Sequence, residues 1–160
     1  INDLRDIKSI RWHFIGHLQA NKVRSVVRSF DFIHSIDSSS LAERCSRICG
    51  EEQRKPKIML QVKFREDPNK GGFLRDDLVR DWPNISRLPN FLINGLMTIA
   101  PFQIEQKEKE KLFFECREFA NLLGLPDCSM GMSSDWQEAL KAGTTWLRLG
   151  SALFGERSQG

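Results

Sequence analysis

Short apolar runs alternate along the chain with longer segments in which apolar residues recur every three or four positions. The short runs predict strands, and the longer segments predict amphipathic helices. Strands are expected at residues 11–16, 32–36, 57–64, 91–99, 128–132 and 145–150. Helices are expected at 23–30, 38–49, 76–81, 104–123 and 134–143, with a polar loop at 65–73. This alternation is typical of repeated βα units and a parallel sheet.

Serine and glycine residues mark several of the expected helix boundaries. The serines at 38–40 are good N-cap residues for the second helix, which Gly50 is expected to end. Ser134 is followed three residues later by Gln137, so these two residues fit the capping-box pattern at the start of the last helix. Gly143 is expected to end that helix.

Two architectures accommodate six βα units. An open, doubly wound sheet can stop at six strands, whereas a (β/α)8 barrel needs eight strands and typically about 250 residues. The chain has 160 residues, enough for one domain with its own core, and is short of such a barrel by about two βα units. It begins at Ile1, within the repeating pattern, as a fragment of a longer chain would. No linker divides it, so residues 1–160 are expected to form a single domain.

Composition narrows the class of protein and its partners. The charged content of 28% and apolar content of 40% are ordinary for a soluble protein. No apolar run approaches the ~18 residues of a membrane span, and the first residues lack a signal-peptide layout. The net charge of +3 is spread along the chain and forms no basic stripe with aromatic residues, so nucleic acid is not an expected partner.

Neither the cysteines nor the histidines form a recognisable metal-binding or catalytic motif. Cys45 and Cys49 share a face of the second expected helix, where they could be half a metal site or a redox pair. Because no second pair completes the ligands, all four cysteines are instead expected to be buried free thiols in a reduced, cytoplasmic compartment. The histidines are expected to be satisfied core or rim residues, since their spacing gives neither a zinc site nor a Ser–His–acid triad: His13, His17 and His34.

The most informative residues follow the last two expected strands, each of which opens into a turn rich in glycine and serine, at residues 131–134 and 150–151. Backbone N–H groups and hydroxyls in such turns can surround a phosphate. Arg148 is flanked by Leu147 and Leu149, so it is expected to face the interior, where its guanidinium needs a ligand or a carboxylate. These features predict a small phosphorylated ligand at the carboxyl ends of the strands. Ordinary capped turns and an interior salt bridge are the alternative.

A series of motifs extends along the chain. Residues 12–22 read Trp-His-Phe-Ile-Gly-His-Leu-Gln-Ala-Asn-Lys, with Asn21 and Lys22 at a helix start where they could meet a ligand from the opposite side. Further motifs follow at residues 34–38, 69–73, 95–99, 131–135 and 148–155. Together these segments resemble the YggS/PROSC family of pyridoxal phosphate homeostasis proteins, whose first motif is WHFIGxLQxNK. The motifs come in the family's order and span nearly the whole chain.

The resemblance implies an α/β fold, a (β/α)8 TIM barrel of the alanine racemase N-terminal type, with pyridoxal 5'-phosphate (PLP) in its mouth. Here the barrel is expected to be incomplete, with about six βα units and the first two missing, so that residues 1–160 are its C-terminal three quarters. The residues that the resemblance places at the phosphate are Ser133, Gly150 and Ser151. It places Arg148 opposite the pyridine nitrogen. The residues placed beside the cofactor are Asn21, Met97 and Met132.

One departure from the family concerns its Schiff-base lysine. In the family this lysine ends the first barrel strand, and a strand with a Gly-Glu-Asn motif follows it. Neither segment occurs in this sequence, so no lysine of the chain is assigned that role, and no catalytic or metal-ligating residue is assigned. The sequence upstream of Ile1 is where such a strand is expected.

The expected function is that of a non-catalytic, cytoplasmic carrier or regulator in PLP homeostasis. An arginine at the pyridine nitrogen weakens the ring as an electron acceptor, and the chain has no tyrosine to serve as a second base. A monomer is expected, with PLP-dependent enzymes as transient recipients of the cofactor. A racemase-like amino-acid enzyme is the alternative for the intact protein, and a partner-binding remnant without cofactor is a third interpretation.

Overall fold

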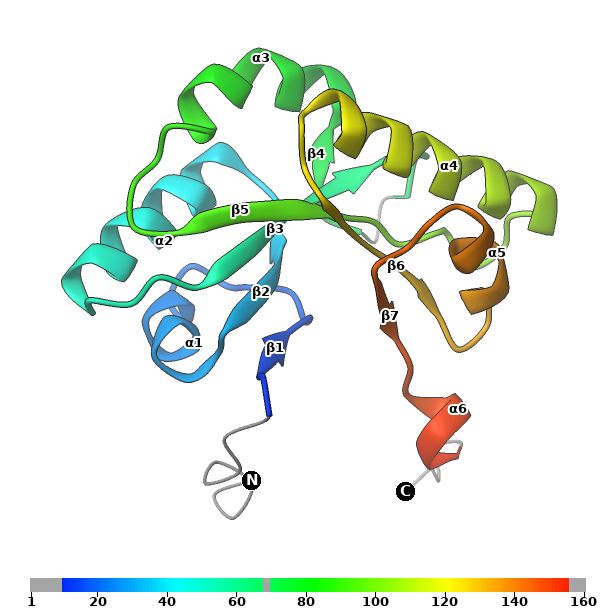
Figure 1. Ribbon diagram of the computed structural model, residues 1–160, viewed down its shortest axis with the longest axis horizontal. Helices are drawn as coiled ribbons and strands as arrows, with labels where there is room; N and C mark the ends of the chain where they lie inside the picture. The colour runs from blue at the N-terminus through cyan, green and yellow to red at the C-terminus, as the bar shows by residue number, and fades with distance from the viewer. Residues whose placement is uncertain (1–9, 68–69, 156–160) are drawn as a thin grey trace.

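The centre of the molecule is a parallel sheet that curls into an arch (Figure 1). The computed structural model describes residues 10–67 and 70–155. Six strands lie side by side in the order β1-β2-β3-β5-β6-β7. Their bounds are His13–Phe14, Phe32–Ile36, Lys57–Lys63, Leu92–Met97, Asp127–Met132 and Trp146–Arg148. Because the order follows the chain and never reverses, the sheet is the wall of a barrel and not a doubly wound sheet.

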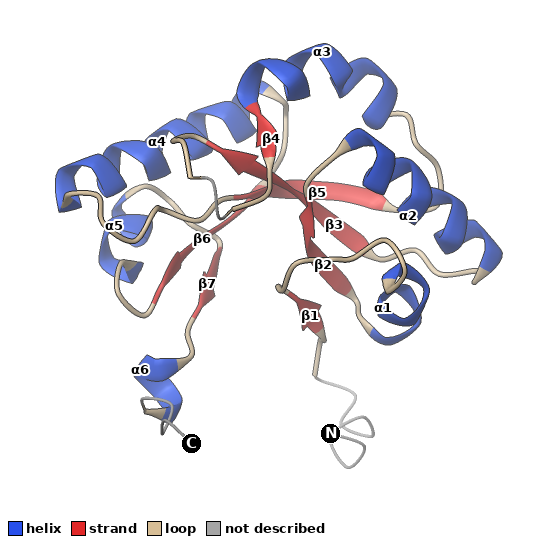
Figure 2. Cartoon of the chain, turned by 180° about the vertical axis from the view of Figure 1, so that it is seen from behind, coloured by secondary structure: helices blue, strands red, loops and turns tan. Residues whose placement is uncertain are grey.

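Helices α1 to α5 cover the convex side of the arch, and the concave side carries none of them (Figures 1 and 2). The helices span Val23–Ser29 (α1), Ser39–Glu51 (α2), Arg75–Ile85 (α3), Gln106–Leu122 (α4), Trp136–Lys141 (α5) and Ser151–Phe154 (α6). Within the described residues β1 and β7 each pair on one side only, so the arch is open between them. The fold is therefore an incomplete (β/α)8 barrel, as expected.

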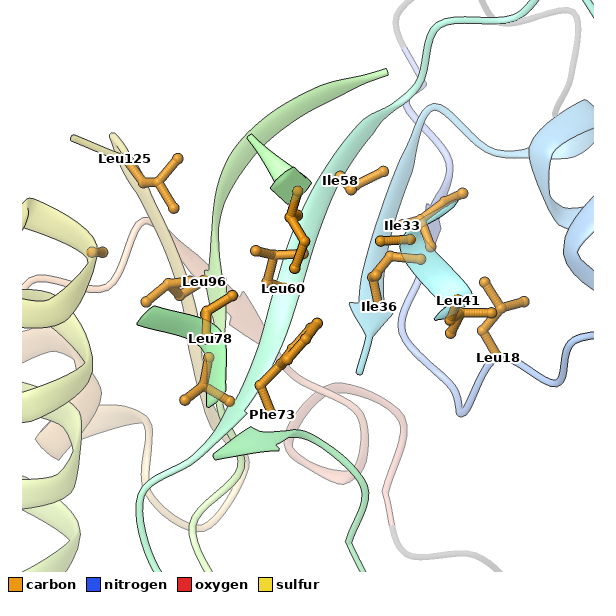
Figure 3. Close-up of a cluster of buried hydrophobic side chains, with 14 of the residues drawn as sticks. Leu18, Ile33, Ile36, Leu41, Ile58, Leu60, Phe73, Leu78, Leu96 and Leu125 are labelled. Atoms are coloured by element: carbon orange, nitrogen blue, oxygen red, sulfur yellow. The ribbon is translucent and has the colours of Figure 1, made fainter. Parts of the chain in front are cut away.

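The hydrophobic core lies between the sheet and the helices (Figure 3). Ile33, Ile58, Leu60 and Leu96 point from the strands towards the helices and are fully buried. Helix side chains meet them there, among them Leu41, Leu78, Phe113 and Phe119. Burying one such side chain stabilises the fold by roughly 1.5–3 kcal/mol. This apolar layer positions the strands and therefore the residues at their carboxyl ends.

The concave side of the sheet carries a different and more polar set of residues. Because side chains alternate along a strand, the neighbours of core residues face inwards. Met97 follows Leu96, and Ser129 lies between Cys128 and Met130, so both face the inside of the arch, where both are fully buried. Arg148 follows Leu147, which packs against the core, and its contacts described below confirm that it faces inwards.

Several element boundaries differ from the sequence expectations. The first strand is shorter than residues 11–16, and the third helix is longer than 76–81 and contains Pro83. Within the expected loop a two-residue strand, Phe73–Leu74 (β4), pairs with β3. Helix α2 continues through Gly50, although Ser38 caps its start as expected by accepting a hydrogen bond from the Leu41 N–H at 3.4 Å. Ile1, where the sequence begins, and Asn69 of the motif at residues 69–73 lie outside the described residues.

The expected cap of the last helix at Ser134 is wrong. Helix α5 begins at Trp136, with Asp135 in the N-cap position and Ser134 exposed. The Asp135 carboxylate instead accepts a hydrogen bond from the Met132 N–H at 2.7 Å, which closes the turn before the helix. The helix ends at Lys141, and Gly143 follows with a φ of 81°. Asp135 thus occupies the N-cap position, but its side chain makes no hydrogen bond to an N–H of the helix.

All four cysteines are buried and free, as expected. The Sγ atoms of Cys45 and Cys49 lie 3.9 Å apart on α2. Among the described residues no group of three or more His, Cys, Asp or Glu side chains is placed to hold a metal ion. In the same part of the chain, no helix has both the length and the apolar composition needed to cross a membrane.

Candidate functional site at the carboxyl ends of β6 and β7

The two glycine- and serine-rich turns lie in contact with each other. Strands β6 and β7 are neighbours, with Met132 opposite Arg148, so their carboxyl ends meet at one edge of the sheet. The Gly150 N–H donates a hydrogen bond to Ser133 Oγ over 3.3 Å. Ser151 begins α6 and is exposed, and the space where a Cβ on Gly150 would point is open within 4 Å. The structure therefore gathers hydroxyls and backbone N–H groups beside accessible space.

Arg148 lies at the same strand end, with its guanidinium held by neutral groups. Nη1 donates to Ser129 Oγ and Nη2 donates to the Thr98 carbonyl oxygen, both at 2.8 Å. No ion pair among the described residues includes Arg148, so the salt bridge offered as an alternative does not occur there. Burial lowers the pKa of Arg148 to about 10, and the group remains a cation at neutral pH. A cation so placed is suited to an acceptor on a ligand.

A chain of polar side chains runs from Arg148 across the inside of the arch. Ser129 Oγ lies 2.8 Å from His34 Nδ1, and His34 Nε2 lies 2.9 Å from His13 Nδ1. His13 stacks on Phe32 with ring centroids 4.2 Å apart. Sequence reasoning expected satisfied histidines, which is confirmed for these two, but it missed their link to Arg148. The available signal was that each residue occupies an inward position of its strand.

Trp146 packs against His13, at the end of this chain of side chains that is far from Arg148. Its ring centroid lies 4.7 Å from that of His13, and its Nε1–H donates to Asp127 Oδ2 over 3.1 Å. The same carboxylate oxygen accepts a hydrogen bond from the Asn94 side chain. Strands β5, β6 and β7 are thus joined inside the arch below Arg148. These contacts hold the indole against the histidines and fill the space beside them.

His17, the third histidine, lies outside this network. It is exposed, and its Nδ1 is 3.6 Å from Asp37 Oδ2, at the carboxyl ends of β1 and β2. Asn21, a candidate cofactor residue, is also exposed, in the turn before α1. None of the hydrogen bonds among the described residues joins Asn21 to the two turns. Met97 is buried on the concave side, whereas Met132 is 43% exposed.

A pocket of about 450 Å³ borders the first turn. Gln106 and Lys109 of α4 line one part of it, and residues 133–138 line the rest. Ser133 is the one candidate residue that it shares with the site described above, since Arg148, Gly150 and Ser151 are not among its lining residues. The contact of the two turns, and not this pocket, therefore defines the candidate site.

The pKa of His34 is lowered to about 3, mainly by burial and also by the nearby His13 and Arg148, while Asp127 acts in the opposite direction. The folded chain therefore excludes a proton that the unfolded chain binds below about pH 6.5. Stability is expected to fall as the pH drops from about 6.5 towards 3, by about 1.4 kcal/mol per pH unit for this one proton. The His34→Asn variant lacks this group, so urea unfolding should show about 1.5–2 kcal/mol less loss between about pH 6.5 and pH 5. Equal losses in the two proteins would contradict a buried neutral His34.

Comparison with known proteins identifies the family. The model of the family described as "Alanine racemase, N-terminal domain" matches residues 3–158. A pyridoxal phosphate homeostasis protein of Synechocystis sp. is 42% identical over 163 residues, which cover 98% of this chain and 75% of that protein. A protein of the same name from Pseudomonas aeruginosa is 37% identical over 94% of this chain and 66% of its own length.

Solved structures lead to the same family. PipY of Synechococcus elongatus PCC7942, solved without PLP, has a TM-score of 0.93 and 46% identity over 96% of this chain and 75% of PipY. PipY with PLP bound has a TM-score of 0.90 and 45% identity over 96% of this chain and 74% of PipY. By sequence over nearly all of its length, and by fold, the chain belongs to the pyridoxal phosphate homeostasis proteins, a family with the fold of the alanine racemase N-terminal domain.

Proposed function

We propose that this chain binds PLP where β6 and β7 end and serves PLP homeostasis as a non-catalytic carrier or regulator. The observation that carries the proposal is the contact between the turns of Ser133 and Gly150 beside an arginine that has no carboxylate partner among the described residues. Membership of the family supports it, as does the PLP bound to PipY. In this role a monomeric, cytoplasmic carrier passes the cofactor to PLP-dependent enzymes.

The donor set at this edge of the sheet fits PLP. A phosphate needs several hydrogen-bond donors, for which the Ser133 hydroxyl and the Ser151 N–H are proposed, with the Gly150 N–H joining them when it turns from Ser133 Oγ to the ligand. The ring nitrogen needs one donor, and the Arg148 guanidinium has five N–H groups, of which two are hydrogen-bonded as described above. Bound PLP supplies an aldehyde that reacts with amines and a ring that accepts electrons. Asn21, Met97 and Met132 are proposed to lie beside the ring.

A carrier fits these residues better than a racemase-like enzyme. A cationic arginine that donates to the ring nitrogen disfavours protonation there, which weakens the ring as an electron acceptor. Racemisation further needs a base on each face of the substrate, and the chain has no tyrosine for that role. Exchange of the α-proton of alanine in heavy water, measured in the presence of PLP, separates the two functions. A carrier shows no exchange above that of PLP alone.

The PLP site is tested with the Ser133→Ala variant. Equilibrium dialysis is expected to show binding of PLP by the unmodified chain and about tenfold weaker binding by the variant, because the hydroxyl donates to a charged phosphate. Ser40→Ala is the matched control, since Ser40 is an exposed serine at the start of α2, far along the chain from the two turns. If Ser133→Ala and Ser40→Ala bind PLP equally well, the phosphate does not lie at the two turns.

A further inference from the structure

Four polar residues on four different strands form one continuous hydrogen-bond chain. His13 lies on β1, His34 on β2, Ser129 on β6 and Arg148 on β7. Strands β2 and β6 are not neighbours in the sheet, so the contact between His34 and Ser129 crosses the inside of the arch. His34 and Ser129 are at most 1% exposed, which excludes water as a competing partner. The chain of contacts ends at the guanidinium proposed to face the PLP ring.

The hydrogen-bonding capacity of each group gives this chain one direction. Arginine only donates, so the Ser129 oxygen accepts from Arg148 Nη1. The single hydroxyl hydrogen of Ser129 is then donated to His34 Nδ1. His34 is therefore neutral with its proton on Nε2, which donates to His13 Nδ1. The opposite direction would leave the buried Ser129 hydroxyl hydrogen without an acceptor among the described residues, which is costly.

The charges around His34 reinforce this state. Arg148 and His13 face its ring from β7 and β1, and the Asp127 carboxylate acts on it from β6. His13 in turn faces Asp31. A proton on His34 Nδ1 would place a second cation near Arg148 and would turn the acceptor of the Ser129 hydrogen into a donor. The Ser129 oxygen would then accept from both partners, and its own buried hydrogen would be left without an acceptor among the described residues.

We propose that Ser129 and His34 are positioning residues of Arg148, which they hold by this one-directional chain in the place that receives the ring nitrogen of PLP. The proposal rests on the proposed function, because it assigns Arg148 to the ring. Ser129 and His34 touch the guanidinium or each other and are not assigned any contact with PLP. Their effect on PLP affinity is therefore exerted entirely through Arg148.

The direction of the hydrogen-bond chain is tested on the unmodified protein without PLP. Histidine-selective nitrogen NMR is expected to show His34 with an unprotonated Nδ1 and a protonated Nε2. This state should persist from about pH 8 to about pH 5, a range in which an ordinary histidine becomes charged. A proton on Nδ1, or a His34 that titrates in this range, overturns the proposal. This readout does not depend on whether PLP binds.

The positioning role is tested by affinity, with paired variants of His34. Asparagine offers a side-chain oxygen near the place of Nδ1, whereas leucine offers no acceptor. His34→Leu and Ser129→Ala are expected to weaken PLP binding about tenfold, and His34→Asn less than about threefold. Ser46→Ala is the matched control, because Ser46 is also a buried serine whose hydroxyl is hydrogen-bonded, but on α2 and to Pro89. It should bind PLP as the unmodified chain does.

Inorganic phosphate separates a positioning role from general damage to the fold. Phosphate occupies only the end of the site at Ser133 and Gly150, so all four variants should bind it as tightly as the unmodified chain. Equal loss of phosphate and PLP affinity contradicts the positioning role, as does unchanged PLP affinity in His34→Leu and Ser129→Ala. If the unmodified protein binds no PLP, the proposed function fails. The NMR result still decides the direction of the hydrogen-bond chain.

Discussion

Replacing Gly131 by alanine is expected to lower the free energy of unfolding by about 3–4 kcal/mol, through steric overlap and backbone strain together. Gly131 has a φ of 90°, which L-residues with a side chain rarely adopt. A Cβ there would lie 2.5 Å from the Cβ of Ala139 on α5 and 2.9 Å from Leu147 Cδ2 on β7. The missing side chain thus lets β6, β7 and α5 meet just before Ser133.

Gly124→Ala is the matched control for this substitution. Gly124 follows α4 with a φ of 70°, and a Cβ there would have no atom within 4 Å. Its replacement therefore costs the backbone strain alone, about 1–2 kcal/mol. Urea unfolding of both variants, compared at an unchanged slope, measures the difference. Equal losses would show that α5 can move away from β6 without cost, and the two turns would then not be held by Gly131.

Short-range patterns of the sequence predicted the strands and the direction of Arg148. Strand β3 appears as an apolar run, as expected of a strand that is covered on both faces. Arg148 lies between two leucines, so the two-residue period of a strand gives its inward direction. The two turns were also visible, because two serines follow β6 and a glycine and a serine lie just beyond the end of β7. Each of these features depends on residues only a few positions apart, so the local sequence is enough to predict it.

The contacts inside the arch could not be predicted in this way. His34 and Ser129 are 95 residues apart and meet only because the sheet curls. The pairing of β6 with β7 also shifts register between Ser129 and Met132, so the simple alternation of faces does not continue to the end of β6. This irregularity accompanies the half-exposed Met132, which the resemblance placed beside the cofactor. Curvature and register depend on packing of whole elements, which no local pattern encodes.

The replacement of Arg148 by methionine is expected to weaken PLP binding by about 30-fold to 100-fold while leaving the fold at least as stable. Burial lowers the pKa of Arg148 from its ordinary value to about 10, so the charged form is disfavoured in the folded state by on the order of 3 kcal/mol. Because this pKa is lowered, the cost is present at every pH below about 10 and disappears as the pH rises above the ordinary value. Methionine has a similar length and carries no charge.

In Arg148→Met, the loss of the two hydrogen bonds of the guanidinium limits the gain in the free energy of unfolding. Ser129 Oγ and the Thr98 carbonyl each lose a donor, at about 1 kcal/mol apiece, which leaves a net stabilisation of about 1 kcal/mol. Urea unfolding and equilibrium dialysis with PLP at neutral pH measure both effects on the same variant. Arg148→Lys is the control, because it keeps the buried charge but loses the planar fork, and it should lower both stability and affinity. A marked loss of stability in Arg148→Met would mean that the arginine is retained for the fold. A stable variant that no longer binds PLP would mean that the chain keeps a costly buried cation for its ligand.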